Sequence, residues 1–142
     1  MRVLVAGRGD ADARGCVEKM IRESGAELCK AGECELAVCL PLGVLPESTQ
    51  AETILLCGDE PHARIPRGTV VTYGVEPRNT LTVSSLGQSS CVVALQRGLR
   101  GFDGALIEPC EKGCDMRGDV YDTLVLEGVR LLLHRDEKET QS

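Results

Sequence analysis

Hydrophobic residues in the first half of the chain gather in short continuous runs rather than in an alternating pattern. Four runs are rich in Val, Leu, Ile and Ala, and each is followed directly by glycine or proline. They cover residues 2–6, 35–40, 53–57 and 69–73. Continuous apolar runs of this length are typical of strands covered on both faces, as in a parallel sheet. The first half of the chain therefore predicts four parallel strands.

The segments between these predicted strands differ in kind. Apolar residues recur at helical spacing over 16–21, and Gly25 is placed to end a helix there. Segments 41–46 and 60–66, in contrast, each contain two prolines, and proline disfavours a helix interior. We therefore expect non-helical connections at these two crossovers and thin cover on one side of the sheet.

After Gly74 the pattern changes. Shorter apolar segments follow one another across glycine-containing intervals, which is typical of antiparallel hairpins. These segments lie at 80–86, 91–96 and 105–108. Asp119 then stands where a helix N-cap is expected, before an apolar helical face. That face consists of Tyr121, Leu124, Val125, Gly128 and Leu132.

Together these patterns predict an α/β fold: a mostly parallel, Rossmann-like sheet, followed by a three-stranded antiparallel meander and a C-terminal helix. A length of 142 residues is that of one domain, which we place at residues 1–134. Segment 135–142 contains no apolar residue, and we expect it to be a disordered tail.

Composition argues against nucleic acid as a partner. The chain has a formal net charge of −6 and only three aromatic residues, one Phe and two Tyr. A polyanion would be repelled, and bases would have almost no stacking surface, so nucleic acid is not an expected partner. The apolar run at 2–6 is too short for a signal peptide or a membrane span. We therefore expect a cytoplasmic protein that does not associate with membranes.

Eight cysteines are present, and their placement favours reduced thiols. Cys39, Cys57 and Cys91 lie inside apolar runs, where a free cysteine acts as a small hydrophobic residue. Cys110 and Cys114 are the exception, because they flank a short polar segment that resembles a turn. This pair supplies half of a tetrahedral metal site, or a thiol for redox chemistry.

Three short motifs between residues 55 and 133 resemble the central, ATP-binding domain of Mur ligases. Cys57-Gly-Asp-Glu-Pro61 is similar to that family's Asn-x-Asp-Asp-Pro segment, and Thr72-Tyr73-Gly74 matches its Thr-Tyr-Gly. The family's His-Asn-x-x-Asn helix start, which holds adenine, corresponds here to Gly118-Asp119 and Asp122. By resemblance, Asp59, Tyr73, Asp119 and Asp122 would line a site for ATP or ADP.

The phosphate-binding part of that family is missing from this chain. No Gly-Lys dipeptide occurs, and the segment after the first predicted strand is Gly7-Arg-Gly-Asp-Ala-Asp12. Phosphoryl transfer needs a lysine and backbone amides around the phosphates, and carboxylates there are unfavourable. Gly7 and Gly9 also begin a dinucleotide-binding pattern, but the third glycine is replaced by Asp12. Tight-turn geometry is the favoured explanation of both glycines.

The sequence therefore predicts a degenerate relative of the Mur ligase central domain without ligase or ATPase activity. It would act as a binding or protein-interaction module, in a cell-envelope context if the ancestry indicates one. Its partner would be a second copy of the chain or another protein. Two alternatives stay open. The first is a nucleotide or other small ligand held near Gly7, Gly9, Asp59, Tyr73 and Asp119. The second is a thiol- or metal-dependent enzyme that uses Cys110 and Cys114.

Overall fold

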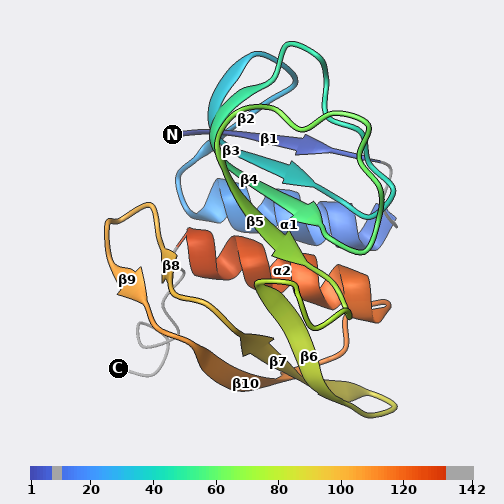
Figure 1. The fold of residues 1–142 in the computed structure, drawn as a ribbon. Helices are drawn as coiled ribbons and strands as arrows, with labels where there is room; N and C mark the ends of the chain where they lie inside the picture. Colours follow the sequence, from blue (N-terminus) through green and yellow to red (C-terminus); the bar gives the residue numbers. More distant parts are fainter. Residues whose placement is uncertain (8–10, 134–142) are drawn as a thin grey trace.

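An eight-stranded sheet runs through the computed structural model, which describes residues 1–7 and 11–133 (Figure 1). The sheet is formed by β1 (Arg2–Ala6), β2 (Glu27–Cys29), β3 (Glu33–Cys39), β4 (Gln50–Cys57), β5 (Thr69–Tyr73), β6 (Leu81–Leu86), β7 (Ser90–Leu95) and β10 (Cys110–Asp115). Their spatial order is β10-β7-β6-β5-β4-β3-β1-β2. The described helices are α1 (Ala11–Glu23) and α2 (Val120–Leu132).

The predicted fold class is confirmed. Strands β1 to β6 pair in parallel, whereas β6, β7 and β10 pair antiparallel. The parallel and antiparallel parts meet at one register pair, Tyr73 with Leu81. α2 follows the meander as expected.

The third strand of the meander was predicted at the wrong place. Segment 105–108 contributes only to a separate two-stranded hairpin of β8 (Leu99–Arg100) and β9 (Leu106–Ile107). The third strand is β10, where the sequence had indicated a turn. The short edge strand β2 was not predicted at all.

α1 ends at the glycine that the sequence indicated. The amide of Gly25 donates to the carbonyl of Arg22 (3.0 Å), and that of Ala26 donates to the carbonyl of Ile21 (3.2 Å). Gly25 has a φ of 86°, a left-handed conformation that favours glycine. These bonds form a Schellman motif, which satisfies the last carbonyls of the helix.

α2 begins with a capping box. The Asp119 carboxylate accepts from the Asp122 amide (2.9 Å), and the Asp122 carboxylate accepts from the Asp119 amide (3.3 Å). The predicted N-cap is therefore confirmed. In the middle of α2, a Cβ on Gly128 would lie 2.9 Å from Leu55 Cδ2, so this glycine lets the helix approach β4 closely.

Both helices pack on the same face of the sheet (Figure 1). This face carries the larger core cluster, with Tyr73, Leu55 and Leu124 among its fully buried members. The opposite face has a smaller apolar cluster that includes Leu4, Ala37 and Ile54, with Leu45 packed against it from the proline-rich segment. The connections from β3 to β4 and from β4 to β5 contain no helix, which explains the thin cover on this side.

Two predictions fall outside the described residues, namely the position of Gly9 and the tail 135–142. Among the residues that are described, no helix is long and apolar enough to cross a membrane.

Candidate functional site

Asp59 lies at the carboxyl end of β4 and is engaged by four hydrogen bonds. One carboxylate oxygen accepts from the Val75 amide (2.7 Å) and the Tyr121 hydroxyl (2.9 Å). The other accepts from the Asn79 side-chain amide (2.8 Å) and the Glu76 amide (3.3 Å). The predicted ligand residue therefore connects the loop after β4, the loop after β5 and the start of α2.

These bonds shift two pKa values in opposite directions. Burial by itself would raise the pKa of Asp59, but the hydrogen bonds from Asn79, Val75 and Tyr121 lower it below its usual range. The same bond to Asp59, together with burial, raises the pKa of Tyr121 to about 12. At neutral pH the Tyr121 phenol is therefore protonated and donates a hydrogen bond to the ionised Asp59 carboxylate.

Tyr73 is fully buried and does not line an open site. Its hydroxyl donates to the Cys39 carbonyl (2.7 Å). Burial raises its pKa far above the ordinary value for tyrosine. The matched Thr-Tyr-Gly segment therefore has a packing role here, because the Tyr73 ring belongs to the larger core cluster.

Gly7 follows β1 with a φ of 107°, and its surroundings are closely packed. A Cβ at this position would lie 2.9 Å from Gly43 Cα, in the connection from β3 to β4. The Arg14 guanidinium group of α1 donates two hydrogen bonds. One terminal nitrogen donates to the Gly7 carbonyl, and the other donates to the Val5 carbonyl (3.2 Å). The Arg14 side chain and the Gly43 backbone thus close the carboxyl end of β1.

Cys110 and Cys114 lie in β10 rather than in a turn, which corrects the predicted placement. Four residues of extended chain separate their Cα atoms by about 13 Å. Two thiolates that ligate one metal ion must approach much more closely, since metal–sulfur bonds are about 2.3 Å long. Within the described residues, no group of three or more His, Cys, Asp or Glu side chains has an arrangement that could hold a metal ion.

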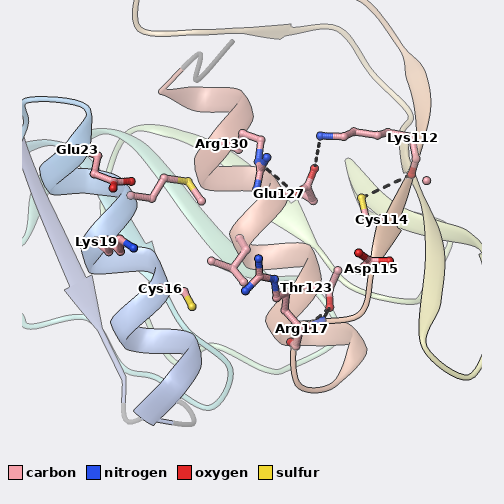
Figure 2. Close-up of a pocket in the computed structure, with 13 residues that line it drawn as sticks. Cys16, Lys19, Glu23, Lys112, Cys114, Asp115, Arg117, Thr123, Glu127 and Arg130 are labelled. Carbon is pink, nitrogen blue, oxygen red and sulfur yellow. Dashed lines mark hydrogen bonds and ion pairs between the residues drawn. The ribbon is translucent and has the colours of Figure 1, made fainter. Parts of the chain in front are cut away.

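The structure instead brings together residues from α1, β10 and α2 around an open cavity of about 480 Å³ (Figure 2). Four basic and three acidic side chains lie on its wall. The lining consists of Cys16, Lys19, Met20, Glu23, Lys112, Gly113, Cys114, Asp115, Arg117, Thr123, Leu126, Glu127 and Arg130. A local excess of basic residues contrasts with the formal charge of −6 for the chain.

Glu127 is the buried charge at the centre of this wall. Only 8% of the residue is exposed, and its carboxylate pairs with Lys112 (3.3 Å) and Arg130 (3.2 Å). A buried carboxylate needs such partners to remain ionised. Lys112 and Arg130, two of the four basic side chains of the cavity, are therefore paired with Glu127.

Lys19 and Arg117 differ from that pair. Both are exposed, and within the described part of the chain neither side chain has an ion-pair or hydrogen-bond partner. Figure 2 shows both side chains between α1 and α2, where they line the cavity. The Arg117 backbone is held in position because its amide donates to the Thr123 hydroxyl (2.8 Å), which in turn donates to the Asp119 carbonyl (3.0 Å).

No pattern in the sequence indicated this cavity. Lys19 lies on the polar side of a predicted helix, and Arg117 lies in a segment without apolar periodicity. Only the packing of α1 beside α2 brings them together. The one local signal was the Asp119 cap, which fixes where the chain enters α2 and thus where Arg117 lies.

In comparisons with known proteins, no model of a protein family matches this chain, and no curated protein matches it.

Proposed function

We propose that this domain is a binding module that holds a small anionic ligand in the cavity between α1, α2 and β10. The observation that carries this proposal is the presence of two exposed cations, Lys19 and Arg117, in the lining of the cavity. Two cations that are not neutralised within the described residues, in a chain of net charge −6, favour an anion at this position. The exposed position of both side chains lets a ligand reach them from solvent.

The chain carries no phosphoryl-transfer chemistry in this proposal. Asp59 accepts four hydrogen bonds within the protein, and Asp119 and Asp122 form the capping box of α2. These contacts support structural roles for the three carboxylates rather than contacts to a nucleotide or its magnesium ion. The packing of Gly43 against Gly7 supports the same conclusion for the phosphates. A nucleotide in the ancestral adenine position therefore has less support than an anion in the cavity.

We retain descent from the Mur ligase central domain as part of the proposal. The short motifs that carry the resemblance would then survive because they stabilise the fold. In this scheme Asp59 changed from a residue near the nucleotide to a connection between loops. The cell-envelope context of that family remains the setting in which to search for the natural ligand.

The test is a titration followed by thermal unfolding at low ionic strength. Inorganic phosphate, pyrophosphate, ADP and a dicarboxylate serve as anionic probes of different size. A ligand present at a hundred times its dissociation constant adds about 2.7 kcal/mol to the free energy of unfolding. We expect stabilisation by at least one of these anions, and a strong decrease of the effect at high salt.

Matched variants locate the effect. Lys19→Gln and Arg117→Gln should each weaken the stabilisation, whereas Arg67→Gln, an exposed arginine in the loop before β5, should not. If all three variants respond alike, or if none of the four anions raises the melting temperature, the proposed function is wrong.

A further inference from the structure

Two cysteines face each other across neighbouring strands. Cys91 of β7 and Cys114 of β10 are direct register partners in the antiparallel part of the sheet. Directly opposed residues project to the same side of a sheet, and both belong to the apolar cluster beneath α2. Both are free thiols. The sequence did not indicate this pair, because 22 residues lie between its members.

The hydrogen-bond pattern fixes the spacing of the pair. The Met116 amide donates to the Ser89 carbonyl (2.9 Å), so this opposed pair is of the hydrogen-bonded type. Such pairs alternate along the ladder, which makes Cys91 and Cys114 a hydrogen-bonded pair as well, with Cα atoms about 5.5 Å apart. Their Cβ atoms then lie near the upper end of the range of about 4.5–5.5 Å. A relaxed disulfide needs about 3.5–4.5 Å, so this spacing is wide for an S–S bond.

The same spacing suits an ion between the two sulfurs. Two metal–sulfur bonds of about 2.3 Å in line place the sulfurs about 4.6 Å apart, which side chains on these Cβ atoms can span. Thiolate ligands select soft ions such as Cu(I). We propose that Cys91 and Cys114 form a two-coordinate site for a soft, thiophilic cation of the Cu(I) type. Binding replaces both thiol protons, so that one Cu(I) yields a bis-thiolate complex and two released protons.

The surroundings allow entry and partly balance the charge. Cys91 is 4% exposed, whereas Cys114 is half-buried and lines the cavity, from which an ion can reach the pair. The complex carries one negative charge, and Lys112 and Arg130 lie on the same cavity wall. Burial and the nearby Glu127 raise the pKa of the Cys114 thiol to about 11. Without an ion, the pair is therefore protonated at neutral pH.

The test is an anaerobic titration of the reduced full chain with Cu(I), with bicinchoninate as a competing chelator. We expect the first ion per chain to be withheld from the chelator and to give a thiolate-to-Cu(I) charge-transfer band. In the variants Cys91→Ala and Cys114→Ala, the chelator should remove that ion from the protein. Cys110→Ala is the matched control, because Cys110 lies on the same strand opposite Leu95 and should leave binding unchanged.

Thermal unfolding of each variant shows whether it is folded, and Cys91→Val and Cys114→Ser replace any alanine variant that is not. Three results would overturn the proposal. They are retention of the first ion by both single variants, loss of the ion in the Cys110 variant, and a Cys91–Cys114 disulfide that forms readily in the purified protein. The result does not depend on the anion site, since Lys19→Gln and Arg117→Gln leave both sulfurs in place.

Discussion

At the residue scale, Asp59 shows that a residue singled out by a short motif can have a structural role. The sequence singled it out by resemblance to a nucleotide-binding segment, and the structure places it at the expected end of the sheet. Its neighbours decide its role: two backbone amides, the Asn79 amide and the Tyr121 hydroxyl occupy the carboxylate. None of these contacts could be predicted from sequence, because Tyr121 is 62 residues away.

Replacing Asp59 by alanine should lower the free energy of unfolding by roughly 2–3 kcal/mol, since four donors lose a charged acceptor. Tyr121→Phe removes one of the four bonds and should cost about 1 kcal/mol. Urea unfolding of both variants gives the comparison. A cost for Asp59→Ala no larger than that for Tyr121→Phe would contradict a shared role of the four bonds.

The alkaline titration of the tyrosines tests the same contact. The chain has two Tyr and no Trp, so the long-wavelength phenolate band of its ultraviolet difference spectrum reports on these two side chains. Tyr121, with a pKa of about 12, should stay protonated as the pH passes the ordinary value of about 10. Because this pKa is raised in the folded state, the stability it contributes is complete below pH 10 and is lost as the pH rises toward 12.

The control for this titration is Asp59→Asn, which removes the carboxylate charge. Tyr121 should then titrate closer to pH 10, while Tyr73 should not ionise before the protein unfolds. Ionisation of Tyr121 at the same pH in both proteins would show that Asp59 does not set its pKa.

At the element scale, the sequence predicted those strands and helices whose local pattern was strong. β1, β5 and α2 follow from continuous apolar runs or from a clear cap. β10 does not, because Cys-Glu-Lys-Gly-Cys-Asp contains a glycine and three charged residues and has no hydrophobic alternation. Pairing with β7 holds this segment in an extended conformation instead, and the Lys112 ammonium group forms an ion pair with Glu127 of α2. Tertiary contacts thus decide the structure of this segment.

The cap of α2 can be tested separately from its packing. Asp119→Ala removes the acceptor for the Asp122 amide, and such cap losses cost about 1 kcal/mol. Asp119→Ser keeps an oxygen acceptor and should cost much less. Chemical denaturation distinguishes the two variants. Equal destabilisation by Ala and Ser would mean that the carboxylate acts through something other than the cap.

At the scale of the whole molecule, the sheet consists of two parts that are joined by little backbone pairing. β5 and β6 share one register pair, supported by the bond from the Gly74 amide to the Leu81 carbonyl (3.1 Å). α2 packs across both parts. The sequence predicted the change from parallel to antiparallel strands but not the cavity, since α1 belongs to one part and β10 to the other.

Hydrogen exchange should reveal this division. Cooperative units of a protein open with different free energies, and the amides of β7 and β10 should exchange at a lower opening free energy than those of β3 and β4. Native-state exchange followed by mass spectrometry measures both groups in one sample. A single opening free energy for all four strands would show that the sheet behaves as one unit.

The single pairing between β5 and β6 also has a consequence for how the molecule deforms. A sheet resists changes of twist through its ladder of hydrogen bonds, and at this line the ladder is one pair long. We therefore expect the two parts of the sheet to twist relative to each other more easily at this line than within either part. The cavity is lined by α1 on one side and by β10 on the other, and these elements belong to the parallel and the antiparallel part of the molecule (Figure 1). Such a twist would therefore change the width of the cavity. A ligand that contacts both walls would restrict this twist and stiffen the sheet between β5 and β6.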